Sequence, residues 1–105
     1  MHQLTIFANV GSQPKKHTFE SGKEIIEFSI AESVTDHNGE KSTIWHDVRG
    51  FGNVVNLPIN SGDYVNIIGK LRYNIFNDKE GRKQVRSYIL ADKVYIIQKL
   101  PKKES

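Results

Sequence analysis

The chain has 105 residues, 37% of them hydrophobic and none of them cysteine, which fits one small domain without disulfide bonds or thiolate metal sites. Charged residues make up 26%, and no run approaches the ~20 apolar residues of a membrane-spanning helix. Fifteen Lys and Arg against twelve Asp and Glu give a net charge of +3, which suits a polyanionic partner only if the positive charges cluster.

Apolar residues recur mostly with a period of two, which is typical of β-strands. The first two strands are predicted at 4–10 and 24–31, with a bend at 11–14 where glycine and proline occur. The second of these strands alternates apolar and polar residues, as expected of a strand with one buried side. The polar stretch from 32 to 42 predicts an exposed hairpin loop.

The third predicted strand, 43–52, has two chemically different faces. One face carries Ile44, His46, Val48 and Gly50. The other carries Trp45, Asp47, Arg49 and Phe51. The second face therefore presents aromatic rings with an arginine between them, a combination that a buried core does not need.

The rest of the chain continues the β pattern after one short interruption. Residues 53–59 are predicted to form a brief helical turn, followed by a strand at 63–73. A hairpin tip at 77–81 leads to a last strand at 82–98. Residues 99–105 are expected to be a polar, frayed tail.

Inward-facing positions of the 63–73 strand are assigned by alternation to Val65, Ile67, Gly69 and Leu71, with Lys70 and Arg72 pointing outward. An inward glycine permits the tight bend that a small barrel needs. Five strands with a short helix between the third and fourth predict an all-β, five-stranded OB-fold barrel over 1–98, with the last hairpin protruding. An open SH3-like or sandwich sheet is the alternative.

Catalytic chemistry is not indicated by any motif in the chain. There is no nucleophile elbow, no zinc-protease pattern and no phosphate-binding glycine loop. The four histidines are far apart and lack metal-ligand spacing. We therefore expect a protein that is not an enzyme and holds no cofactor, metal or small-molecule substrate. The lack of cysteine and of a signal sequence favours the cytoplasm.

The aromatic face of the 43–52 strand suggests a stacking platform. Unpaired bases offer π-faces of any sequence to Trp45 and Phe51, and Arg49 adds cation–π and phosphate attraction. The competing interpretation is that another subunit covers this face and buries Trp45.

A second group of basic and aromatic side chains is concentrated on the last hairpin, which could arch over a groove. Its members are Lys70, Arg72, Tyr73, Phe76, Arg82, Lys83 and Arg86. The competing interpretation is a solvated hairpin whose lysines serve solubility and protect a sheet edge.

Several segments resemble the bacterial single-stranded DNA-binding proteins. Residues 44–52 (IWHDVRGFG) resemble the family strand T-E-W-H-x-V-x-x-F-G, and residues 61–72 (SGDYVNIIGKLR) resemble K-G-x-x-V-x-I-x-G-x-L-R. Residues 9–14 (NVGSQP) and 76–81 (FNDKEG) are similar to two family turns. The resemblance spans about 4–97, in the same order and with compatible spacing.

The resemblance implies roles for particular residues. Trp45, Phe51 and Phe76 match the DNA-stacking aromatics of the family, although the last position is usually a tryptophan. Arg49 and Arg72 match arginines that contact the DNA backbone. His46 matches a histidine near subunit contacts, and the family works as a homotetramer, with dimers in some lineages.

The leading prediction is non-sequence-specific binding and protection of single-stranded DNA in replication, recombination or repair. Two alternatives stay open at this point. One is a primosome-type OB accessory factor that binds replication proteins as well as DNA. The other is an OB-fold protein-interaction module without DNA affinity.

Overall fold

The computed structural model describes residues 3–99, which form six β-strands and one short 3-10 helix. The elements in chain order are β1 (Gln3–Val10), β2 (Lys15–Thr18), β3 (Glu24–Thr35), β4 (Lys41–Phe51), η1 (Gly52–Asn56), β5 (Tyr64–Asn77) and β6 (Lys83–Gln98). The predicted helical turn after the third strand is η1, and Pro58 lies just beyond its end.

The sheet closes on itself as a ring. Its strands follow the order β1-β5-β6-β4-β3, and β1 pairs with β3 at Asn9↔Ala31 and Val10↔Ile30. The β4–β6 pair is parallel and the other pairs are antiparallel. This arrangement confirms the predicted all-β OB-fold barrel.

A sixth strand, β2, was not predicted. It pairs with the first part of β3 at the edge of the sheet, from Lys15↔Glu27 to Thr18↔Glu24. All four of its residues are exposed, so its sequence carries no apolar alternation that would mark it as a strand.

The core is built from the inward-facing residues of the five barrel strands, together with two valines of η1 and Ile59. Its fully buried members include Ile26, Ile30, Val48, Val65, Ile67 and Ile89. Asp63 is buried as well, at 1% exposure, and its carboxylate pairs with Lys99 Nζ at 2.9 Å. Lys99, expected in a frayed tail, is therefore tied to the barrel, whereas the rest of the predicted tail lies outside the described residues.

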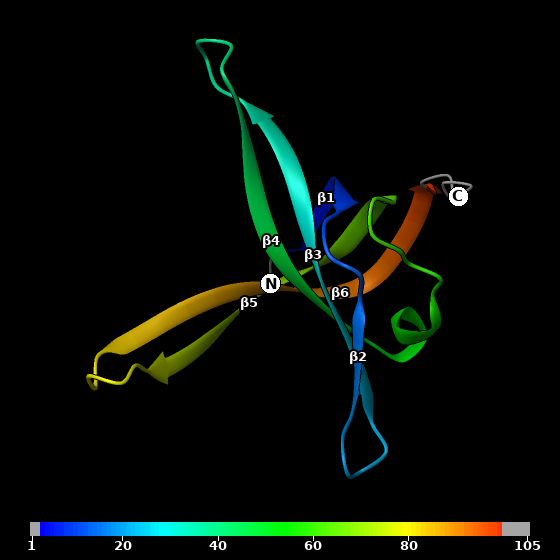
Figure 1. Cartoon of the computed structure of the whole chain (residues 1–105), viewed down its shortest axis with the longest axis vertical. Helices are drawn as coiled ribbons and strands as arrows, with labels where there is room; N and C mark the ends of the chain where they lie inside the picture. Colours follow the sequence, from blue (N-terminus) through cyan, green and yellow to red (C-terminus); the bar gives the residue numbers. More distant parts are fainter. Residues whose placement is uncertain (1–2, 100–105) are drawn as a thin grey trace, which may run out of the picture.

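Three hairpins project from the barrel, formed by β2–β3, β3–β4 and β5–β6 (Figure 1). The loop expected at 32–42 is shorter than predicted, because β3 continues to Thr35 and β4 starts at Lys41. Asp36 closes the turn by accepting hydrogen bonds from the backbone N–H groups of Asn38 and Glu40, both at 2.9 Å. Main-chain pairing continues along this arm although most of its side chains are polar.

Leu71 corrects a second expectation. It lies on the same side of β5 as the buried Gly69, but its side chain is 44% exposed. The barrel core ends at the root of the β5–β6 arm, so inward-pointing residues beyond Gly69 face solvent.

None of the helices found within residues 3–99 has the length and apolar character needed to cross a bilayer.

Gly69 lies where β5 and β6 approach most closely, beside an irregularity in their register between Ile68 and Gly69. A Cβ at this position would lie 2.2 Å from the carbonyl oxygen of Leu90 and 3.0 Å from the Cα of Ala91. Both are backbone atoms of β6, which cannot move without disturbing the barrel.

Gly69→Ala is therefore expected to lower the free energy of unfolding by about 1–3 kcal/mol through overpacking. Urea denaturation of the purified variant measures the change. Ser42→Ala, at an exposed position of β4, is the control and should stay within about 0.5 kcal/mol of the parent chain. Equal stabilities for both variants would contradict the close approach.

Candidate nucleic-acid interface

Trp45 lies on the outer face of β4, the face that turns away from the barrel core, and its side chain is 62% exposed. The indole rests on the turn after β1, because a Cβ at Gly11 would lie 2.4 Å from Trp45 Cζ3. Glycine therefore permits the close approach between ring and backbone. The indole is supported by the turn and still offers most of its surface to a ligand.

The turn that supports the indole is itself held by hydrogen bonds. Gly11 N–H donates to the carbonyl oxygen of Ser29 at 2.8 Å, and Ser61 Oγ donates to the carbonyl oxygen of Gly11 at 2.9 Å. Ser29 N–H donates to Ser12 Oγ at 3.3 Å, and the two serine hydroxyls lie 3.1 Å apart. These bonds fix the support of the ring before any ligand arrives.

Arg49 connects the barrel to the root of the β5–β6 arm. Its guanidinium carbon lies 4.4 Å from the centroid of the Tyr88 ring, and its Nε lies 3.7 Å from a carboxylate oxygen of Glu27. With its amide oxygen turned toward the guanidinium, Asn74 accepts hydrogen bonds from both terminal nitrogens of Arg49, at 3.2 and 3.3 Å. Arg49 is thus held in place by neighbours from three strands.

The other two predicted aromatic side chains each lie beside a cation. Phe51 is 37% exposed, with Lys23 Nζ 4.8 Å from its ring centroid. Phe76 is 44% exposed, with the guanidinium carbon of Arg86 5.9 Å from its centroid. Each ring therefore has a positive group within cation–π distance.

Cross-strand pairing shows which predicted residues share a face of the β5–β6 arm. The pairs on the outer face are Lys70↔Leu90, Arg72↔Tyr88, Asn74↔Arg86 and Phe76↔Gln84. Tyr73 pairs with Ser87 and Lys83 pairs with Asn77, so both lie on the opposite face of the arm. Arg82 lies in the turn at the tip, where Asp78 and Glu80 form ion pairs with it.

His46 lies on the inner face of β4, opposite Trp45. Its Nε2 is 3.1 Å from a carboxylate oxygen of Glu32, and its side chain is 26% exposed. The structure therefore separates His46 from the aromatic and basic residues of the outer face.

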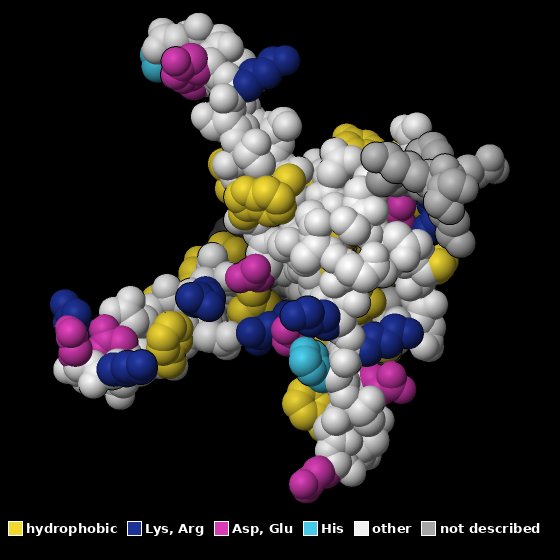
Figure 2. Space-filling model, viewed as in Figure 1, with side chains coloured by type: hydrophobic (Ala, Val, Ile, Leu, Met, Phe, Trp, Pro, Cys, Tyr) yellow, Lys and Arg dark blue, Asp and Glu magenta, His cyan; other side chains and the backbone are white. Residues whose placement is uncertain are grey.

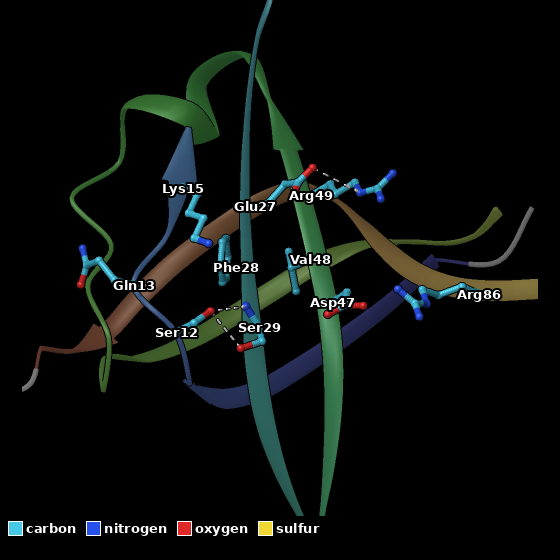
Figure 3. Close-up of a pocket in the computed structure, with 10 residues that line it drawn as sticks. All are labelled: Ser12, Gln13, Lys15, Glu27, Phe28, Ser29, Asp47, Val48, Arg49 and Arg86. Carbon is cyan, nitrogen blue, oxygen red and sulfur yellow. Dashed lines mark hydrogen bonds and ion pairs between the residues drawn. The ribbon is translucent and has the colours of Figure 1, made fainter. Parts of the chain in front are cut away.

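A hollow of about 320 Å³ opens on the outer face beside Arg49 (Figure 3). Its lining residues are Ser12, Gln13, Lys15, Glu27, Phe28, Ser29, Asp47, Val48, Arg49 and Arg86. Figure 2 shows Lys and Arg side chains following one another from the β5–β6 arm across the barrel toward the β2–β3 arm. Acidic side chains lie among these cations, and the hollow itself is lined by three cations and two acids.

The sequence pattern missed several residues of this surface. Tyr88 and Asn74 contact Arg49, and Ser12 and Ser29 line the hollow. Alternation along the last strand could have placed Tyr88 beside Arg86, two residues away on the same face. The serines could not be found this way, because their approach depends on the packing of the turn against β3.

Exposed rings flanked by cations can stack flat, apolar groups and hold anionic groups beside them, which is the chemistry of an unpaired nucleic-acid strand. No group of three or more His, Asp or Glu in the part of the chain that the structure describes could hold a metal ion.

A family model described as the single-strand binding protein family matches residues 1–97. Single-stranded DNA-binding protein 1 of Xylella fastidiosa (strain 9a5c) is 25% identical over 107 residues, covering 94% of this chain and 79% of the relative. A single-stranded DNA-binding protein of Rickettsia conorii is 27% identical over 100 residues, covering 86% of this chain and 65% of the relative.

Solved structures share the fold. A Plasmodium falciparum SSB in complex with ssDNA superimposes with a TM-score of 0.78 at 18% identity, covering 93% of this chain and 94% of that chain. A small single-stranded DNA-binding protein from Streptomyces coelicolor superimposes with a TM-score of 0.71, also at 18% identity, covering 90% of this chain and 93% of that one.

Gly11→Ala is expected to push the indole of Trp45 off its support, since the ring is the movable partner in the contact. Trp45 is the single tryptophan of the chain, so its fluorescence reports the change directly. The emission maximum should move to longer wavelength and iodide should quench it more strongly, while the far-ultraviolet circular dichroism stays the same. Ser42→Ala is the control. An unchanged emission spectrum in Gly11→Ala would contradict the contact.

Proposed function

We propose that this chain, which belongs to the single-strand binding protein family, binds single-stranded DNA with little sequence preference and shields it during replication, recombination or repair. The observation that carries the proposal is the supported but exposed indole of Trp45, on the same face of β4 as Arg49. Single-stranded DNA is proposed as the ligand because the relatives are named single-stranded DNA-binding proteins and one similar structure is a complex with ssDNA. The family match favours this function over a primosome-type accessory factor or an interaction module without DNA affinity.

Binding would combine stacking with charge neutralisation. Bases stack on Trp45, Phe51 and Phe76, each worth ~1–3 kcal/mol. The phosphates between them are attracted by cations of the same outer face, which are Lys70, Arg72, Arg86 and Arg49. The β5–β6 arm projects from the barrel (Figure 1), and Phe76, Arg72 and Arg86 belong to its two strands. One DNA strand can therefore contact both the arm and the barrel.

Residues 1–98 would serve as one binding domain that performs no chemical reaction. Stacking and phosphate attraction are reversible contacts that need no nucleophile, metal or cofactor. This role would place the protein in the cytoplasm, where bacterial DNA lies.

We also propose that the chain assembles as a homo-oligomer. Three side chains of the sheet formed by β1, β5 and β6 are half exposed and apolar: Phe7 at 53%, Tyr95 at 50% and Ile97 at 54%. β1 pairs with β5 along one edge, but it pairs with β3 only at Asn9 and Val10. The remaining edge of β1 can pair with the same strand of a second copy, which would also cover the apolar side chains.

A second contact would involve His46. It shares the inner face of β4 with Ile44, which is 43% exposed. One self-complementary contact makes a dimer, whereas a tetramer of dihedral symmetry needs two different ones. Two separate surfaces on each chain therefore support a tetramer.

Trp45→Ala and Phe76→Ala are each expected to weaken binding of oligo(dT) by ~1–3 kcal/mol, because each removes one stacking ring. Tyr73→Ala is the matched control, since it removes an exposed ring from the opposite face of the same arm. Fluorescence anisotropy of labelled oligonucleotides of graded length, at two salt concentrations, gives the affinities. The logarithm of affinity should fall with the logarithm of salt concentration at about −0.7 per phosphate contacted.

Equal losses in all three of these variants would show that the outer face has no special role. Wild-type chain that binds no oligo(dT) at micromolar concentration would overturn the proposed function.

Phe7→Glu is expected to break the assembly at the β1 contact, and Ile44→Glu is expected to break it at the His46 contact. Light scattering of a tetramer should then give dimers for each single variant and monomers for the double variant. Lys41→Glu, at the end of the β3–β4 arm, changes the charge without an apolar contact and should leave the mass unchanged. A wild-type monomer, or variants with the wild-type mass, would contradict the two-contact assembly.

A further inference from the structure

Asp47 is a carboxylate in the middle of the proposed DNA-binding face. It lies between Trp45 and Arg49 on the outer side of β4, directly opposite Ser29 of β3. Its side chain is exposed, and within residues 3–99 it makes no ion pair or hydrogen bond. Glu27, the other acid of the hollow, is paired with Arg49 instead. The free carboxylate of Asp47 repels phosphate. A DNA strand bound across this face would therefore have to bring a different group next to it.

The geometry brings the carboxylate next to the stacking ring. Residues two apart on one face of a strand are separated by roughly 7 Å, so Asp47 has Trp45 on one side and Arg49 on the other. The indole leans on Gly11, toward the serines that line the hollow with Asp47. In Figure 3 Asp47 lies within the hollow, on the side of Arg86. A base stacked on the indole would thus have a polar edge beside this carboxylate.

An ionised carboxylate accepts hydrogen bonds and donates none. Cytosine, adenine and guanine carry an exocyclic amino group that can donate to it, and aspartate is a known acceptor for the amino group of cytosine. Thymine carries carbonyl oxygens on either side of a single N–H, and these repel a carboxylate. The polar edge of an unpaired base is free to make such a contact.

We propose that Asp47 accepts a hydrogen bond from the exocyclic amino group of the base stacked on Trp45, which makes this one subsite discriminate against thymine. The inference rests on the proposed function. Phosphate is the wrong partner for Asp47, because the two negative charges repel each other. The guanidinium of Arg86 lines the same hollow and can take the neighbouring phosphate.

The preference against thymine is modest, because it acts at a single base and because the side chain of Asp47 is exposed to water. The rings of Phe51 and Phe76 each have a cation near their face, Lys23 at 4.8 Å and Arg86 at 5.9 Å from the ring centroid, and stacking on these rings accepts any base. Low sequence specificity and one selective subsite are therefore compatible.

The test compares oligo(dC) with oligo(dT) of equal length, by anisotropy at fixed salt, for the wild-type chain and Asp47→Asn. The asparagine amide has nearly the same shape but can also donate to a thymine carbonyl. The ratio of the Kd for oligo(dT) to the Kd for oligo(dC) is expected to fall about three- to tenfold in the variant, because the amide still accepts from cytosine and now also donates to thymine, so this base edge is no longer discriminated. Glu40→Gln removes a negative charge from the turn of the β3–β4 arm and should leave this ratio unchanged.

An Asp47→Asn variant that binds both oligonucleotides more tightly by the same factor would overturn the inference, because the carboxylate would then act only through its charge. The same ratio change in Glu40→Gln would overturn it too. These outcomes leave the proposed function intact. Failure of the wild-type chain to bind either oligonucleotide would instead remove the proposed function and this inference with it.

Discussion

The β3–β4 and β5–β6 hairpins continue as paired strands beyond the end of the barrel core, and this extension creates the exposed surface described above. Within the barrel, the alternation of a strand separates core from solvent: Ile67 of β5 is 0% exposed. Farther along the same strand and on the same side, Ile75 is 64% exposed, because no second layer covers the arm. Cross-strand hydrogen bonds hold the arms where the core does not reach, and so both faces of each arm are available for contacts.

Because the same strands run from the barrel into the arms, some features could be predicted from the sequence and others could not. Strand parity depends only on the period of two, so it correctly placed Val48 in the core and Trp45 on the outer side. It could not tell where the core ends along a strand, which is why Leu71 was assigned to the interior. The polar strand β2 and the contact of Tyr88 with Arg49 depend on pairing between distant segments, which local composition does not encode.

Positive charge on the outer face and at the tip of the β5–β6 arm is partly neutralised by the chain itself. Arg49 is paired with Glu27, and Arg82 is paired with two acids at the tip of its arm. With a net charge of only +3, attraction to phosphates is limited compared with a strongly basic protein. The proposed stacking on exposed rings would then supply a large share of the affinity, and it would do so without reading sequence.

The proposed selective subsite at Trp45 would have a particular consequence for a long DNA strand. A single strand can bind in many registers, which differ only in the base that occupies the position on Trp45. If Asp47 disfavours thymine there, the strand shifts to the next register that offers an amino-bearing base, at little cost in mixed sequence. The carboxylate would then choose the register in which the strand lies on the protein, and only tracts of thymine would lose affinity.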